Sequence, residues 1–111
     1  MWRDDAYLLD IVVAARKIVK FTDGVAREHF DADEVLQNAV MRLLEIIGEA
    51  ARSISQNTKD VHTEIPWREI VGMRNRLIHH YFRVDVEKVW DTITNDIPTL
   101  IMLIEPLVPK D

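Results

Sequence analysis

The chain has 111 residues, no cysteine and a formal net charge of -5 at pH 7; 48% of the residues are hydrophobic and 30% are charged. This length predicts one domain over residues 1–111, and the absence of cysteine excludes a disulfide framework and a thiolate metal site. The acidic charge argues against a broad basic surface that coats nucleic acid, and the lack of a leader or a long apolar run predicts a cytoplasmic protein with no membrane contact.

Two amphipathic helices are predicted in the first half of the chain. The first runs from about Asp4 to Thr22, and Asp23-Gly24 supplies its stop. Residues 25–30 are expected to be a connector, and Asp31 or Asp33 would cap the second helix, which ends near Ser55. Its apolar residues alternate steps of four and three, as the seam of a helical bundle requires. They are Leu36, Val40, Leu43, Ile47, Ala50 and Ile54.

Small residues form a patch on this second helix, where Gly48, Ala50 and Ala51 would let another backbone approach closely. Tight packing within the chain and contact with a second subunit both fit this pattern. Glu45 and Glu49 are typical solvated helix carboxylates. As the alternative, Glu49 would pair with an arginine of the motif described below and hold it in place.

The second half begins with a polar stretch, residues 55–65, which is expected to form a mobile loop. Pro66 suits the first position of the next helix. Asp85 would cap the last helix, and Pro98 should kink or split that helix just before itself. Because no segment shows useful strand alternation, we expect an all-α antiparallel bundle of four main helices plus a short extra helical turn.

Residues 73–82, MRNRLIHHYF, hold an unusual density of polar chemistry. As a continuous helix turning about 100° per residue, this segment would present one apolar stripe to the core. The stripe consists of Ile70, Met73, Leu77 and Tyr81. His79 would then point away from the core, on the same face as Asn75. The plain interpretation is a solvated helix surface, with Arg76 and His80 as a surface pair.

Arg74, followed after four residues by His79 and after one more by Tyr81, resembles a known motif. It is similar to the R-x4-H-x-Y form of the R-x4-6-H motif, found in the HepT-like toxins of the HEPN superfamily of helical ribonucleases. Other segments resemble the HepT-like pattern in the same order, so the resemblance covers most of the chain. They are Gly48-Glu49-Ala50, Ile65-Pro66-Trp67, Val84-Asp85 and Asp96-Ile97-Pro98. His80 departs from the pattern, because a small residue is common there.

The residue types in the motif suit RNA cleavage without a metal. That reaction needs a base for the 2′-OH proton, an acid for the leaving 5′-oxygen and positive charge on the phosphate. His79 can act as base or acid, because imidazole titrates near neutral pH, and Arg74 offers a planar fork of donors to phosphate oxygens. Asn75 would orient the imidazole or contact phosphate, with Arg76 in a supporting role.

One motif supplies one catalytic histidine, whereas the reaction needs two proton-transfer groups. A two-fold homodimer would resolve the shortage by placing both copies of Arg74 and His79 in one cleft. Within one subunit, His80 could take the second proton role instead. No cofactor or metal site is expected: His79 and His80 have no ligand-type partner at i,i+4 spacing, and His62 has none at metal spacing.

The resemblance also implies partners. HEPN ribonucleases are dimers with a composite, metal-independent site, and HepT-like toxins belong to type VII-like toxin–antitoxin pairs with a minimal nucleotidyltransferase (MNT) antitoxin. The antitoxin adenylylates the tyrosine of H-x-Y, here Tyr81, so that the added phosphate would block the RNA site beside Arg74 and His79. The implied substrate is RNA, with transfer RNA as one candidate class. The alternative is a non-catalytic helical module that binds and regulates a nucleotidyltransferase.

Overall fold

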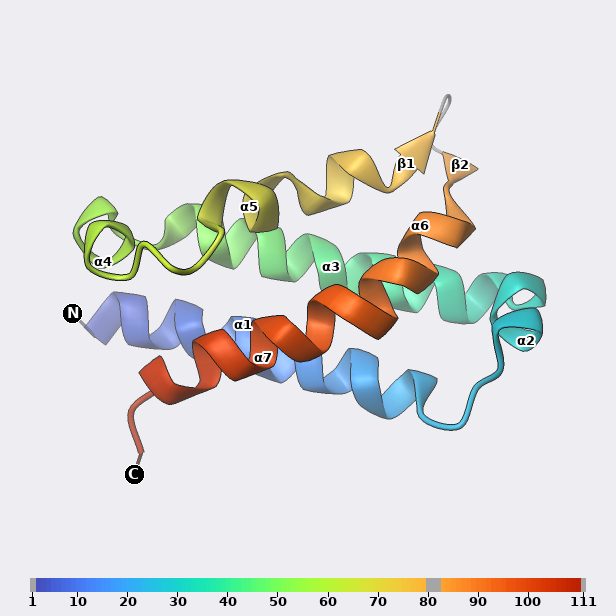
Figure 1. The fold of residues 1–111 in the computed structure, drawn as a ribbon, viewed down its shortest axis with the longest axis horizontal. Helices are drawn as coiled ribbons and strands as arrows, with labels where there is room; N and C mark the ends of the chain where they lie inside the picture. Colours follow the sequence, from blue (N-terminus) through green and yellow to red (C-terminus); the bar gives the residue numbers. More distant parts are fainter. Residues whose placement is uncertain (1, 80–82, 111) are drawn as a thin grey trace.

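The computed structural model describes residues 2–79 and 83–110, without the side chains of Trp2, Arg74, Ile78, His79 and Arg83. Within these residues, four helical segments run alternately in opposite directions (Figure 1). They are α1 (Trp2–Thr22), α3 (Glu34–Ser53), α5 (Trp67–Arg76) and a composite of α6 (Val86–Asp91), η2 (Thr92–Asp96) and α7 (Ile97–Ile104). The prediction of an all-α antiparallel bundle is confirmed.

The core lies where the apolar faces of these segments meet. Helix α1 packs against α3 and α7, and α3 packs against α5. The predicted seam of α3 is confirmed, since Leu36 is half-buried and the other five residues are buried. Full burial of an aliphatic side chain contributes about 1.5–3 kcal/mol, so this seam is a main source of stability. No helix in the described part of the chain is long and apolar enough to cross a membrane.

Two short helices replace the predicted connectors. Helix α2 (Arg27–Ala32) lies in and just after the predicted 25–30 connector, and it buries Phe30 against Trp90 of α6, with ring centroids 5.3 Å apart. Helix α4 (Gln56–Val61) occupies the first part of the predicted 55–65 loop, whereas residues 62–65 are non-helical as predicted. The prediction of a single short extra helical turn therefore underestimates the number of short helices in the described residues. Helices this short are marginal in isolation, and tertiary contacts stabilise them here.

Tertiary contacts to α4 centre on Asp4, whose residue surface is only 4% exposed. One carboxylate oxygen accepts a hydrogen bond from the backbone N–H of Ser55 at 2.9 Å. The other accepts from the Ser55 and Thr58 hydroxyls, each at 2.6 Å. These bonds, with the Ser55 hydroxyl foremost, hold the pKa of Asp4 below its ordinary value. The first turn of α1 is thus tied to the start of α4.

The predicted helix boundaries are largely confirmed by their caps. Asp33 accepts a hydrogen bond from the Leu36 N–H at 3.0 Å, and Asp85 accepts one from the Lys88 N–H at 3.1 Å. Gly24 adopts a φ of 71°, beyond the end of α1. Pro66 precedes α5 rather than opening it. The predicted break before Pro98 is confirmed as the π-helical segment η2, since proline has no N–H to donate to the preceding turn.

Candidate functional site

The motif segment changes secondary structure within itself. Helix α5 ends at Arg76, and β1 (Ile78–His79) pairs antiparallel with β2 (Arg83–Val84). In this register Ile78 is opposite Val84 and His79 is opposite Arg83. The N–H of Asp85 donates to the carbonyl of Leu77 at 2.8 Å, which extends the pairing to the end of α5. His79 therefore lies on β1, a short strand that follows the end of α5 (Figure 1).

The prediction of a helix that continues to Phe82 is wrong. His79 and Asn75 consequently do not share a helical face, and the derived direction for His79 does not apply. Part of the predicted core stripe is confirmed, because Ile70, Met73 and Leu77 are buried. Tyr81, its fourth member, lies outside the described residues. The sequence did carry a signal for strands, since residues 78–84 are rich in β-branched and aromatic types.

The predicted site residues divide between helix α5 and the paired strands β1 and β2, which are called the hairpin below. Arg74, Asn75 and Arg76 occupy the last turn of α5, where positive charge complements the helix dipole, and Asn75 and Arg76 are exposed. The backbone places His79 three residues after the end of that turn. His80 and Tyr81 lie outside the described residues. Catalytic roles for these residues remain predictions.

Gly48 positions α5 against α3. A Cβ atom there would lie 3.3 Å from the carbonyl oxygen of Val71 and 3.5 Å from that of Ile70. The close approach predicted for this patch is therefore made at Gly48 by a helix of the same chain. Glu45 pairs with Arg42 at 2.6 Å, whereas Glu49 is exposed. A pair between Glu49 and Arg74 stays a prediction, since that arginine side chain is not described.

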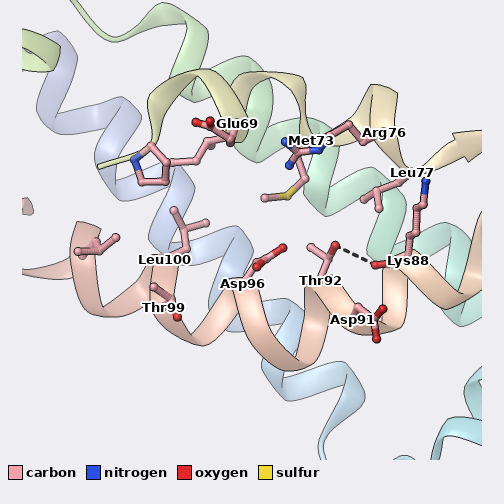
Figure 2. A pocket seen from close by; sticks show the side chains of 13 residues that line it. Glu69, Met73, Arg76, Leu77, Lys88, Asp91, Thr92, Asp96, Thr99 and Leu100 are labelled. Atoms are coloured by element: carbon pink, nitrogen blue, oxygen red, sulfur yellow. Dashed lines mark hydrogen bonds between the residues drawn. The ribbon is translucent and has the colours of Figure 1, made fainter. Parts of the chain in front are cut away.

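A groove of about 670 Å³ lies between α5 and the α6–η2–α7 segment (Figure 2). Sequence reasoning missed it, because it depends on how two helices far apart in the chain are spaced. Buried apolar side chains, including Met73 and Leu100, form its floor. Five charged residues line it, Glu69, Arg76, Lys88, Asp91 and Asp96. Figure 2 shows Lys88 at the hairpin end and Asp96 projecting toward α5. The groove thus combines an apolar floor with charges of both signs.

The other two histidines stand apart from the motif. His29 is exposed on α2, with its Nε2 3.8 Å from a carboxylate oxygen of Asp33. His62, expected to be solvated, follows α4 with its side chain 30% exposed, and its Nδ1 lies 3.6 Å from a carboxylate oxygen of Glu64. No group of three or more potential ligands that could hold a metal ion occurs among the described residues.

A comparison with protein families decides the affiliation of the chain. A family model described as "Ribonuclease HepT-like" matches residues 11–107. The chain belongs to the HepT-like ribonuclease family. The resemblance inferred from the ordered motifs is therefore confirmed.

Curated relatives agree with this assignment. "Probable ribonuclease HepT" from Thermococcus cleftensis is 50% identical over 94 residues, which cover 85% of this chain and 86% of that protein. A protein from Caldanaerobacter subterraneus subsp. tengcongensis, named "Putative RNase", is 37% identical over 95% of this chain and 94% of its own length. One from Methanocaldococcus jannaschii, named likewise, is 35% identical over 93% and 85%. No solved structure matches the chain significantly.

Proposed function

We propose that this HepT-like protein is a metal-independent endoribonuclease in which Arg74 and His79 act on the RNA phosphate. The observation that carries the proposal is the family match over residues 11–107, which includes the R-x4-H-x-Y string. The backbone favours it as well, because the last turn of α5 carries Arg74 and leads directly into the strand that carries His79. Residues 68–83 contain four arginines and two histidines against one acid, so an anionic backbone is attracted to this part of an acidic protein.

In the proposed reaction, a base takes the proton of a ribose 2′-OH, and the 2′-oxygen attacks the adjacent phosphorus. The bond from phosphorus to the 5′-oxygen breaks, and an acid returns a proton to that oxygen. The products are a 2′,3′-cyclic phosphate and a free 5′-OH. His79 serves as a proton-transfer group, and Arg74 stabilises the negative charge that develops on the phosphate.

The second proton-transfer group comes from a second copy of the motif. A two-fold homodimer supplies two copies of His79 and Arg74 to one cleft. Asn75 and Arg76, both exposed at the end of α5, support the site by contacting phosphate or orienting the imidazole. His80 is the alternative second group, and it would make a single subunit sufficient.

We extend the proposal to the regulation of the site. The protein acts as the toxin of a toxin–antitoxin pair, and an MNT-type nucleotidyltransferase adenylylates Tyr81. Tyr81 is two residues from His79 in the chain, so a phosphate attached there introduces negative charge beside the proposed RNA site. This modification would exclude the RNA backbone by occupying the positive charge that binds it.

The test compares cleavage of end-labelled cellular RNA in excess EDTA by wild type, His79→Ala and His29→Ala. Loss of a general acid or base lowers the rate by about 10²–10⁴-fold, so His79→Ala should show almost no cleavage. His29 is the matched control, because it is an exposed histidine on α2, outside the motif. Equal activity of His79→Ala and His29→Ala would remove His79 from the mechanism. If wild type with unmodified Tyr81 does not cut, the protein is instead a module that binds a nucleotidyltransferase.

A further inference from the structure

One side of the helical bundle is open. Helix α1 is packed against α3 and α7, and α3 against α5, whereas α5 and α7 face each other across the groove (Figures 1 and 2). A volume of about 670 Å³ is in the range of small-molecule and cofactor sites. Apolar surface along an unfilled slot is unfavourable in water, so a ligand that covers it gains free energy.

The charges in the groove have an order along its length. Lys88 lies at the end next to the hairpin, the guanidinium of Arg76 extends from there back along α5 toward Met73, and Asp96 has its carboxylate turned toward α5 (Figure 2). Glu69 and Asp91 also line the groove, and the carboxylate of Asp91 is turned away from α5 (Figure 2). Neither Arg76 nor Asp96 has an ion-pair partner within the described part of the chain. Lys88 has only a long contact, 3.9 Å from its Nζ to a carboxylate oxygen of Asp85. A ligand with a negative group at one end and hydrogen-bond donors at the other would complement this pattern.

We propose that the groove binds a guanine nucleotide of the RNA, with its phosphate toward Lys88, its base beneath Arg76 and its base edge on Asp96. Guanine presents two adjacent donors, N1–H and N2–H₂, and a carboxylate offers two acceptor oxygens at matching spacing. The flat base would lie against Met73 and under the planar guanidinium of Arg76, which is one helical turn further along α5.

The other three bases fit a carboxylate less well. Adenine and cytosine present one amino donor beside a ring-nitrogen acceptor, and uracil presents one N–H between two carbonyl oxygens. An acceptor directed at the Asp96 carboxylate is repelled by it, and burial of the unpaired group is unfavourable. The groove therefore discriminates among bases.

The position of the groove links it to the proposed cleavage site. Leu77, at its hairpin end, is two residues before His79, and two residues of chain span at most about 7 Å. A nucleotide seated in the groove would thus have its phosphate near the motif. The inference rests on the proposed ribonuclease function, and it names the base that the enzyme selects next to the cut.

The first test measures binding without cleavage. Guanosine 3′-monophosphate and cytidine 3′-monophosphate are titrated into the protein, and the methyl signals of Met73 and Leu100 are followed by NMR. We expect guanosine 3′-monophosphate to shift both signals and cytidine 3′-monophosphate to bind more weakly. Asp96→Asn should abolish that difference. Glu87→Gln is the matched control, because Glu87 is an exposed carboxylate on the same helical segment and does not line the groove.

The second test maps the ends produced by cleavage of a randomised single-stranded RNA. Wild type should enrich guanosine at one fixed position next to the cut. A good bidentate base contact is worth roughly 5- to 150-fold in discrimination, so Asp96→Asn should lose at least about fivefold of this preference. Glu87→Gln should retain the preference. Circular dichroism verifies that both variants keep the wild-type helix content.

The outcomes separate this inference from the proposed function. Cleavage without guanosine preference, or with a preference that Asp96→Asn retains, overturns the groove assignment and leaves the ribonuclease proposal standing. If the Met73 and Leu100 methyl signals do not shift on addition of guanosine 3′-monophosphate, the groove assignment is also overturned. This result is expected if a second subunit fills the groove. If guanosine 3′-monophosphate binds selectively in the groove but the protein does not cleave RNA, the groove assignment is supported and the ribonuclease proposal is refuted.

Discussion

Replacement of Asp4 by alanine should destabilise the protein. Asp4 is far from the motif in the sequence, so the effect is on the fold. The side chain accepts three hydrogen bonds from Ser55 and Thr58, and Ser55 also caps α4 by accepting from the Thr58 N–H. Asp4→Ala removes the acceptor for all three donors. The N–H of Ser55 then loses its partner, whereas both hydroxyls can rotate toward other acceptors.

The magnitude follows from the type of bond. A hydrogen bond to a charged group contributes a net of about 1.5–3 kcal/mol to stability. The free-energy cost of burying the carboxylate offsets part of the combined contribution of the three bonds. Because the hydroxyls can find new partners, we expect a loss of about 2–3 kcal/mol in the free energy of unfolding. At about 4 °C per kcal/mol for a chain of this size, the melting temperature should fall by roughly 8–12 °C.

The assay is urea unfolding followed by circular dichroism at a fixed protein concentration, since self-association would make stability depend on concentration. Asp5→Ala is the control, because it removes a carboxylate from the same first turn of α1. That residue interacts with the helix dipole, which is worth about 0.3–1 kcal/mol. Equal losses in Asp4→Ala and Asp5→Ala would refute the reasoning, since they would show that the contacts to α4 contribute nothing beyond the dipole.

Three further predictions concern pH, packing and modification. The hydrogen bonds lower the pKa of Asp4 below 3.8 in the folded state, so its contribution to stability is present above that pH and is lost as the pH falls below it. Urea unfolding at a series of pH values should therefore show a steeper decline in the free energy of unfolding below pH 4 for wild type than for Asp4→Asn. Gly48→Val should destabilise by about 1–3 kcal/mol in urea unfolding, because its Cβ would lie 3.3 Å from the Val71 carbonyl oxygen, and wild-type stability would contradict the close packing of α3 on α5. Incubation with the MNT-type partner and ATP should add AMP to wild type but not to Tyr81→Phe, whereas Tyr7→Phe, the control at the other tyrosine, should be modified normally; peptide mass spectrometry that finds AMP elsewhere would remove Tyr81 from the switch.

The sequence by itself determined the features that depend on local pattern. The seam of α3 follows from steps of three and four, and the caps at Asp33 and Asp85 follow from side chains that satisfy N–H groups at a helix start. Pro98 marks the break in the last helix, because proline cannot donate to the preceding turn. The ordered motifs also identified the family, which the match over residues 11–107 confirmed.

Only the tertiary structure decided the features that depend on distant partners. Helix α4 exists beside Asp4, which is more than 50 residues earlier in the chain. The motif turns from helix to strand after Arg76, because residues 78–79 pair with residues 83–84 and the Asp85 N–H bonds to Leu77. The groove arises from the spacing between α5 and α7. Local periodicity carries no information about such contacts, because their free energy appears only when separate segments meet.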